Sequence, residues 1–454
     1  MALHAVNPTT GKEIERFDEF AWKQTDARLT TAAEAFKDWR LTSFAERVDH
    51  MRTLAELLRR NKREYGKIMT LEMGKPITEA MAESEKCAWA CDFYAEKAEA
   101  LLADEEVPTD AKLSLVRHEP LGPILAVMPW NFPFWQVFRF VAPSFMAGNV
   151  GLLKHASNVP RCAISIQEII EEAGFPRGTF NTLLVGSRQV ERIVRDSRIR
   201  AVTLTGSEKA GASVAAVAGS EVKKTVMELG GSDPFIVLKD ADLEKAADVG
   251  AQARCINTGQ SCIAAKRFIV EKAVSKEFIS LFVEAMRSLR VGDPLKEDTQ
   301  VGPVARADLR DELVRQVSAS VSKGARVDLG GKPARGPGFF FEPTVLSGVR
   351  KGMPAYDEEV FGPVAGVITV PGESDAIEVA NDTRYGLGAS IWTENLEKAI
   401  RLVSEVEAGM VFVNGLVKSD PRLPFGGVKS SGYGRELAAF GLREFVNVKT
   451  VWVR

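Results

Sequence analysis

A carboxylate and a thiol stand near the two ends of one short stretch of the chain, from Val226 to Cys262. The carboxylate is Glu228, which lies just before a pair of glycines, and the thiol of Cys262 follows the polar run at residues 257–261. A thiolate is a nucleophile, and a carboxylate held apart from it can activate the water that later releases whatever the thiolate has bound. The pairing predicts covalent catalysis.

Cys262 also has a structural interpretation, because cysteine is among the most buried residue types. The flexible, polar residues before it favour a loop beside a pocket instead. The other four cysteines lie among apolar helical positions and are expected to be inert: Cys87, Cys91, Cys162 and Cys255.

The alternative for Glu228 is a structural ion pair. It sits at the end of an apolar run, where an unpaired charge costs several kcal/mol to bury. Lys223 and Lys224 precede it closely enough to be that partner. A raised pKa would instead make Glu228 a good base.

A third feature, Thr205–Gly211, follows an apolar run and opens a helical pattern. Gly206 lets a phosphate approach the backbone, and free N–H groups at the helix start, beside Ser207, favour an anion. The segment lacks both the G-x-G-x-x-G pattern and the G-K-[ST] of phosphate-binding loops. By itself it is better explained as a plain strand-helix turn.

Composition restricts the class of protein. With 454 residues the chain exceeds one hydrophobic core, and its 45% hydrophobic and 26% charged residues suit a soluble protein of two or more large domains. A net charge of -2 argues against nucleic-acid or membrane-surface partners, so a small-molecule partner is expected. Five scattered cysteines without metal-ligand spacing predict neither a disulfide framework nor a metal site, and they favour the cytoplasm.

Hydrophobic periodicity predicts a mainly helical region over residues 1–110, after a turn at 7–11, with helices at 25–39, 44–64 and 77–102. The acidic residues 104–106 are interpreted as a solvated helix end. Further on, short apolar runs alternate with helical patterns, which indicates parallel sheets covered by helices. The expected strands are 124–128, 150–153, 182–185, 201–204, 235–238, 266–271, 325–329, 340–346, 389–392 and 409–414, and the expected helices include 134–147, 275–289 and 306–323.

Two further segments affect the class of protein. The uncharged run 121–138 approaches the length of a spanning helix, but Pro123, Pro129 and Pro133 would break it, and the first twenty residues lack the apolar core of a signal peptide. The β-rich tail 445–453 would leave an exposed edge, and such edges are often covered by another subunit.

Taken together, seven motifs in this order closely resemble the aldehyde dehydrogenase superfamily over nearly the whole chain. They are Met128–Pro133, Lys154, the turn at Gly206, Glu228–Gly231, Gly259–Cys262, Glu359–Val364 and Pro424–Gly432. The resemblance implies an α/β fold with two Rossmann-like parallel-sheet domains and a small β oligomerisation element. The implied division is a cofactor-binding domain (1–110 and 122–230), a catalytic domain (231–423) and an oligomerisation element (111–121 and 424–454), in a homodimer or homotetramer joined through the C-terminal strand.

The resemblance also assigns roles to residues. It makes Cys262 the nucleophile, Glu228 the general base and Asn131 the amide that holds the oxyanion with the Cys262 N–H. The implied cofactor-binding residues are Trp130, Lys154, Ser157, Gly206, Ser207, Leu229, Glu359 and Phe361. Ser261 and Ile263 flank the nucleophile, so no vicinal disulfide switch is expected.

The cofactor prediction depends on one departure from the family pattern. Many NAD-using relatives carry a glutamate three residues after the lysine, whereas this chain has Ser157 three residues after Lys154. A carboxylate there would repel a 2′-phosphate, while serine offers a hydrogen-bond donor. We therefore expect NADP, with use of both NADP and NAD as the alternative; His155, in place of the usual proline, leaves the loop shape open.

The substrate prediction depends on Trp135 and Arg139, which lie four apart and hence on one helix face. A guanidinium there, with Ser419 in the segment that lines the family's substrate tunnel, suits a second carboxylate on the aldehyde. The run 128–137 resembles the bacterial enzymes that oxidise succinate semialdehyde, which makes that compound the expected substrate. The alternatives are a broader aldehyde or lactaldehyde dehydrogenase with a merely structural Arg139, and a cofactor-binding scaffold without turnover.

Overall fold

Alternating strands and helices build the first of two large sheets in the computed structural model, which describes residues 2–454. Five strands pair in parallel in the order β9-β8-β5-β6-β7, and β17 joins antiparallel beside β9. The strands are β5 (Pro123–Met128), β6 (Val150–His155), β7 (Phe180–Thr182), β8 (Ala201–Thr205), β9 (Lys224–Glu228) and β17 (Gly432–Tyr433). Parallel neighbours need crossover connections, which are α5 (Trp135–Met146), α6 (Pro160–Glu172), α7 (Val190–Arg195) and α8 (Glu208–Ser220).

The N-terminal region packs against this sheet and its helices. It contains α1 (Trp22–Trp39), α2 (Phe44–Arg60), α3 (Lys62–Met73) and α4 (Ile77–Leu101). Apolar side chains of these helices, such as Leu29 and Met51, share one core cluster with Ile124 and Phe138 from the sheet side. The region therefore belongs to the same packing unit as the first sheet, and α4 lies next to α5.

The second sheet has seven strands in the order β12-β13-β14-β11-β10-β15-β16, all paired in parallel except β12 with β13. The strands are β10 (Pro234–Val237), β11 (Arg267–Glu271), β12 (Arg326–Leu329), β13 (Thr344–Ser347), β14 (Val364–Val370), β15 (Gly388–Trp392) and β16 (Met410–Val413). The helices of this half are α9 (Leu243–Cys255), α10 (Ser275–Arg287), α11 (Ala307–Ser322), α12 (Pro354–Asp357), α13 (Glu373–Asn381) and α14 (Leu396–Val403).

Side chains of the central strands alternate between two cores, one on each face of the second sheet. Phe235 and Val237 of β10 lie in one apolar cluster, whereas Ile236 between them lies in the other. This is the two-residue period of a strand buried on both faces. It explains why the run at 235–238 is continuously apolar.

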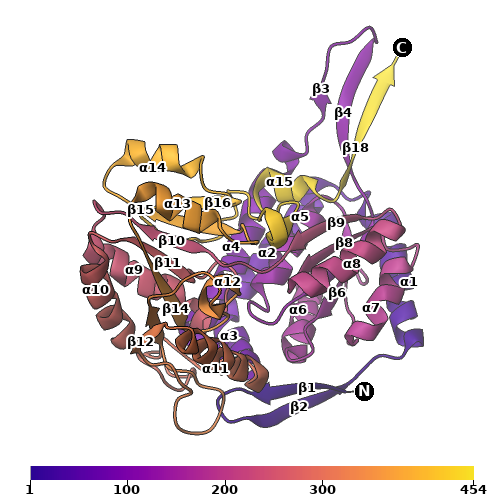
Figure 1. Cartoon of the computed structure of the whole chain (residues 1–454). Coiled ribbons are helices and arrows are strands. Elements are labelled where there is room, and N and C mark those ends of the chain that lie inside the picture. The colour runs from indigo at the N-terminus through magenta and orange to yellow at the C-terminus, as the bar shows by residue number, and fades with distance from the viewer. Residues whose placement is uncertain (1) are drawn as a thin grey trace.

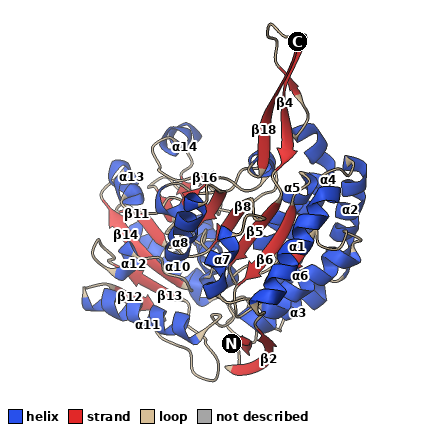
Figure 2. Cartoon of the chain, turned by 90° about the vertical axis from the view of Figure 1, so that its right-hand side faces the viewer, coloured by secondary structure: helices blue, strands red, loops and turns tan. Residues whose placement is uncertain are grey.

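A third, three-stranded sheet projects from the body as an arm, with the C-terminus at its tip (Figures 1 and 2). Its order is β18-β4-β3, from β3 (Glu105–Glu106), β4 (Leu113–Pro120) and β18 (Val446–Val453), and α15 (Ala438–Arg443) precedes β18. The antiparallel pairing runs from Val446 opposite Pro120 to Val453 opposite Leu113. The predicted β-rich tail is thus an edge strand, as expected.

The overall α/β class is confirmed, and five local predictions are corrected. The turn at residues 7–11 joins two strands, β1 (Ala2–Asn7) and β2 (Lys12–Asp18), rather than leading straight into helices. The helix predicted at 44–64 divides at Asn61, whose backbone leaves the helical region. The acidic residues near 105 form β3 rather than a helix end.

The other two corrections concern strand limits. β7 ends at Thr182, because its last pair with β6 joins Thr182 to Leu153 and residues 183–185 run beyond it. β13 begins at Thr344 because Pro343 has no N–H to give to a ladder. None of the described helices is long and apolar enough to cross a membrane.

Candidate active site

Cys262 lies at the meeting point of two cavities, in the loop between α9 and β11. Lys266 stabilises the loop, because its Nζ donates to the carbonyl oxygens of Ser261, Cys262 and Ala264 at 3.0, 2.8 and 3.0 Å. The side chain is half-buried, whereas the other four cysteines are fully buried. A thiol in this position can react with a molecule in either cavity.

Burial raises the pKa of the Cys262 thiol to about 12, while Arg139 and Lys266 oppose this rise. The thiol is therefore protonated at neutral pH in this structure. Reaction requires a group that takes its proton or a further positive charge nearby.

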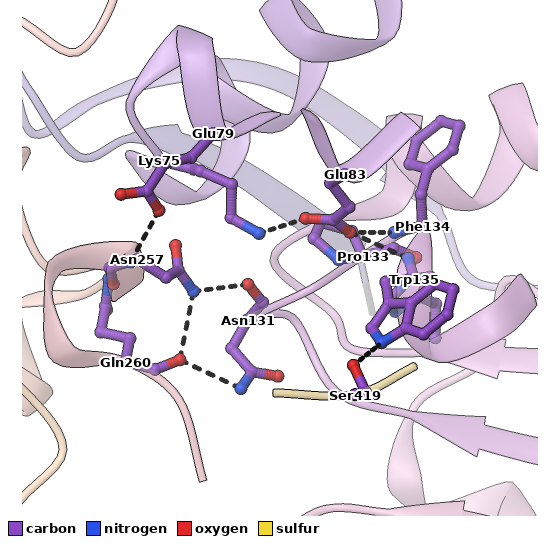
Figure 3. A network of polar contacts seen from close by, with 11 residues as sticks. Lys75, Glu79, Glu83, Asn131, Pro133, Phe134, Trp135, Asn257, Gln260 and Ser419 are labelled. Atoms are coloured by element: carbon purple, nitrogen blue, oxygen red, sulfur yellow. Dashed lines mark hydrogen bonds and ion pairs between the residues drawn. The ribbon is translucent and has the colours of Figure 1, made fainter. Parts of the chain in front are cut away.

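Asn131 is buried, and Asn257 and Gln260 hold it in place (Figure 3). Asn257 Nδ2 donates to the Asn131 carbonyl at 2.7 Å and to the Gln260 carbonyl at 3.1 Å, and Asn131 Nδ2 also donates to the Gln260 carbonyl at 3.1 Å. Because Cys262 follows Gln260 by two residues, these bonds fix the amide relative to the thiol. The second N–H of the Asn131 amide remains available for an oxyanion.

The sequence gives little sign that Asn257 has this role. Its φ is 52°, and that of Thr258 is 57°, so both occupy the left-handed region that ordinary residues avoid. The N–H of Asn257 donates to Glu79 Oε2 at 2.7 Å, which ties the strained turn to α4. Strain of this kind clusters at active sites.

Glu228, the last residue of β9, is 2% exposed, and neither carboxylate oxygen has a hydrogen-bond partner within residues 2–454. The alternative of an ion pair with Lys223 or Lys224 is wrong, because Lys223 donates to backbone carbonyls and Lys224 pairs with Glu444. Burial raises the pKa of Glu228 well above its usual value, and the charge on Glu436 adds to the rise. An unpaired, buried carboxyl is the state expected of a general base before it acts.

The cavity on one side of Cys262 has the features of a dinucleotide site. Its lining includes Pro129, Trp130, Asn131, Thr205, Gly206, Ser207, Leu229, Gly230, Cys262, Arg306, Leu309, Glu359 and Phe361. Seven of the residues predicted to act on the cofactor or the oxyanion therefore meet here.

The start of α8 makes this cavity suitable for a phosphate group. Ser207 is the N-cap of the 13-residue helix, so the free N–H groups of the first turn face the same end as Gly206. A Cβ on Gly230 would come within 2.7 Å of Glu359 Oε2, so a side chain at this position would clash with the carboxylate. Glu359 Oε1 in turn accepts the N–H of Gly231 at 3.0 Å.

Lys154 and Ser157 do not line this cavity. Lys154 lies in β6 and is buried, and burial lowers its pKa while Glu19 opposes the fall. Ser157 is exposed in the turn that follows. The shape of the turn comes from His155, whose Nδ1 accepts the N–H of Ala156 at 2.9 Å and whose Nε2 lies 2.9 Å from the Pro133 carbonyl.

The cavity on the other side of Cys262 contains the three predicted substrate residues Trp135, Arg139 and Ser419. One face of α4 also lines it, through residues at helical spacing that sequence reasoning missed: Glu79, Ala82, Glu83 and Lys86. The amphipathic pattern alone did not separate a cavity-lining face from a core-facing one. Glu83 Oε1 accepts the N–H groups of Phe134 and Trp135, both at 2.9 Å, and its other oxygen pairs with Lys75 (Figure 3).

Arg139 lines this cavity but already has a counter-charge. Its Nε lies 2.7 Å from Glu436 Oε2, although not in line for a hydrogen bond, and both side chains are buried. Gln136 accepts from the guanidinium, which also lies 4.3 Å from the centre of the Phe425 ring. Arg139 thus forms an ion pair, as the structural interpretation of this residue predicts, and it also lines the cavity.

Among residues 2–454 no group of three or more histidine, cysteine, aspartate or glutamate side chains could hold a metal ion. The two cavities meet at Cys262, and Asn131 lines one of them, whereas the buried Glu228 lines neither. The chain belongs to the aldehyde dehydrogenase family, whose model matches residues 1–451.

Within this family, the chain is similar to several proteins described as succinate-semialdehyde dehydrogenases. The chain is 52% identical over 453 residues to a probable succinate-semialdehyde dehydrogenase [NADP(+)] of Synechocystis sp., with 100% of both chains covered. It is 51% identical over 459 residues to a succinate-semialdehyde dehydrogenase [NADP(+)] of Mycobacterium avium, covering 100% of this chain and 97% of the relative. The crystal structure of succinic semialdehyde dehydrogenase from Streptococcus pyogenes in complex with NADP+ covers 100% of both chains, with a TM-score of 0.97 and 39% identity.

Proposed function

We propose that this protein oxidises succinate semialdehyde to succinate with NADP as the oxidant. The observation that carries the proposal is the substrate cavity, which joins the thiol of Cys262 to a wall of cationic and hydrogen-bond-donating side chains. A semialdehyde has an aldehyde at one end and a carboxylate at the other, so it matches both parts of the cavity. The similarity to enzymes described as succinate-semialdehyde dehydrogenases supports the same substrate.

In the proposed mechanism, the Cys262 thiolate attacks the aldehyde carbon and forms a thiohemiacetal. The Asn131 amide and the Cys262 N–H stabilise its oxyanion, a kind of interaction typically worth about 3 kcal/mol. A nicotinamide cofactor, when bound, would supply the acceptor for the hydride that leaves this adduct as the Cys262 thioester forms. Glu228 then takes a proton from the water that hydrolyses the thioester, which releases the acid and the free thiol.

Several side chains are proposed to hold the cofactor. The N–H groups at the start of α8, with Gly206 and Ser207, suit its pyrophosphate. Glu359 suits a ribose, and the aromatic rings of Trp130 and Phe361, 5.8 Å apart and edge to face, suit the nicotinamide end beside Cys262. Leu229 completes this wall.

For the adenosine end we propose Lys154 and Ser157. Both follow from the sequence pattern, and the exposed Ser157 has room for a 2′-phosphate that a glutamate would repel. NADP is therefore the proposed cofactor, and the relatives whose descriptions name NADP(+) support it. Use of NAD as well remains the competing hypothesis.

Trp135, Arg139 and Ser419 are the proposed substrate-binding residues. A second candidate function, a broader aldehyde dehydrogenase, is favoured by one observation: Glu436 already balances the charge of Arg139. NADPH formation from succinate semialdehyde and from butanal, with the wild type, Cys262→Ala and Arg139→Ala, and then with NAD, separates the two. The proposal expects an inactive Cys262→Ala and a strong preference for the semialdehyde that Arg139→Ala weakens; equal use of butanal by the wild type would contradict it.

Assembly and location are also proposals. The projecting arm, with β18 at its edge, supports a homodimer or homotetramer formed through the C-terminal strand. The five free cysteines support a reducing compartment, for which the cytoplasm is our hypothesis.

A further inference from the structure

One wall of the substrate cavity brings together three hydrogen-bonding groups from separate parts of the chain. Lys86 Nζ of α4 donates to Ser419 Oγ at 2.7 Å and lies 4.6 Å from the centre of the Trp135 ring. Trp135 Nε1 donates to the same oxygen at 3.1 Å (Figure 3). We call Lys86, Trp135 and Ser419 the donor cluster.

The roles within the donor cluster are fixed by chemistry. An ammonium group and an indole N–H can only donate, so Ser419 Oγ must accept from both. The Ser419 hydroxyl then keeps its own proton for a third group, and no acceptor for that proton occurs within the described residues. Lys86 has two further N–H groups. The donor cluster therefore has several N–H and O–H groups for which the described residues provide no hydrogen-bond acceptor.

Lys86 also lacks a counter-charge. No carboxylate lies within 4 Å of its Nζ in residues 2–454. Of the acids nearby, Glu83 is occupied by Lys75, and Asp420 by Arg422 at 2.7 Å. Of the other cations that line the cavity, Arg139 is paired with Glu436, and Lys418 is exposed to solvent. Lys86 is thus the half-buried cation of this lining that has no carboxylate partner among the described residues.

We propose that Lys86 is a specificity-determining residue, which binds the distal carboxylate of the semialdehyde together with the hydroxyl of Ser419. The carboxylate supplies both the missing acceptor for the donor cluster and the missing counter-charge. The inference rests on the proposed function and deepens it, because it assigns the preference for a carboxylate to a side chain outside the family motifs. Arg139, balanced by Glu436, then contributes hydrogen bonding and shape.

The charge of Lys86 makes this preference depend on pH. The pKa of Lys86 is lowered to about 8, first by burial and then by Arg139 of α5, while Cys87 and Glu83 of α4 and Asp420 oppose the fall. A lysine is charged below its pKa, so the cation is present at neutral pH and is lost as the pH rises through about 8. The affinity for a carboxylate substrate should fall over the same range, whereas that for an uncharged aldehyde should not.

The first experiment compares Lys86→Met with the wild type on succinate semialdehyde and on butanal. Loss of a charged hydrogen bond should raise KM for the semialdehyde by about tenfold to a hundredfold with little change in kcat, and should leave KM for butanal unchanged. Lys97→Met, on the exposed face of the same helix, is the matched control and should behave as wild type. An unchanged semialdehyde KM in a folded Lys86→Met enzyme overturns the inference.

The second experiment needs no destabilising change. In the wild type, the ratio of KM for the semialdehyde to KM for butanal should rise as the pH is taken through about 8, and a flat ratio overturns the inference. Lys86→Arg keeps its charge in this range and should remove the rise; a rise that persists in this variant also counts against Lys86. Failure of the proposed function is a separate result, since a wild type without preference for the semialdehyde would contradict that function first.

Discussion

At the scale of single residues, two buried carboxyls and one guanidinium are the groups that we propose control the hydrolysis step. Neither oxygen of Glu228 has a hydrogen-bond partner in the described part of the chain, whereas Glu436 lies 2.7 Å from Arg139. Burial raises the pKa of Glu436, and Arg139 opposes this rise. Arg139 therefore stabilises a negative charge on Glu436 directly, whereas Glu228 has no such ion pair among the described residues.

This arrangement predicts the effect of Glu436→Gln on the pH dependence of kcat. Glu436 raises the pKa of Glu228 and Arg139 lowers it. The substitution removes the first effect and frees Arg139 to exert the second, so both changes act in the same direction. Because Glu228 acts as a base only when deprotonated, the rise of kcat with pH should move to lower pH, which a kcat profile measured from acid to neutral pH would detect.

The control is Glu397→Gln, which removes an exposed carboxylate from the first turn of α14. It should leave the pH dependence of kcat unchanged. A Glu436→Gln profile that coincides with the wild type, or that moves to higher pH, would show that Glu436 does not set the pKa of Glu228.

The candidate reactive residues carry a signal in the sequence, but the residues proposed to adjust them do not. Cys262 and Glu228 stand in recognisable runs, since their neighbours provide a flexible loop and a glycine turn. Glu436 lies 208 positions from Glu228, and Lys86 lies 176 positions from Cys262, so neither carries a local signal. Only the packing of distant segments determines that one faces Glu228 and the other Ser419.

At the scale of elements, the loop that carries Cys262 depends on a close approach between two backbones. Gly259 has a φ of 74°, and a Cβ there would come within 2.3 Å of the Gly362 carbonyl oxygen. The second segment also carries Glu359 and Phe361 of the cofactor cavity. The absence of a side chain at Gly259 therefore lets the Cys262 loop pack directly against the segment that lines the cofactor cavity.

We expect Gly259→Ala to abolish activity and to lower the free energy of unfolding by about 2 kcal/mol or more, since it combines a left-handed backbone with an unavoidable clash. Thermal unfolding and NADPH formation measure the two effects. Gly219→Ala in α8 is the matched control, because nothing lies within 4 Å of the added Cβ. Replacing this helical glycine with alanine should raise the free energy of unfolding by up to about 1 kcal/mol. A Gly259→Ala enzyme of normal activity and stability would refute the argument.

Most elements could be predicted because their patterns are long. The two large sheets have continuous apolar strands, and α10 has a regular apolar face. The failures are short or depend on distant partners: β1 and β2 form a hairpin whose buried face is as small as Leu3 and Ala5, and β7 has only three residues, all paired with β6. Such limits are set by pairing rather than by local propensity.

At the scale of the whole molecule, the arm has an open strand edge and exposed apolar side chains that packing within one chain does not explain. β18 has β4 on one side and no strand on the other among the described residues. Val448 and Trp452, four apart and therefore on one face of the strand, are 62% and 48% exposed. An open edge with exposed apolar side chains is unfavourable in water and invites pairing with another strand.

The combined substitution Val448→Asp and Trp452→Asp is therefore expected to reduce the assembled mass to that of one chain, because two carboxylates would have to be buried in the proposed contact. Light scattering during size-exclusion chromatography measures this mass. Val222→Asp replaces an exposed apolar residue that is 94% exposed on the body and should leave the assembly intact. If the double variant keeps the wild-type mass, the oligomer forms through another surface; if the wild type is already a single chain, the arm has a different partner, and its exposed edge must be explained by that partner.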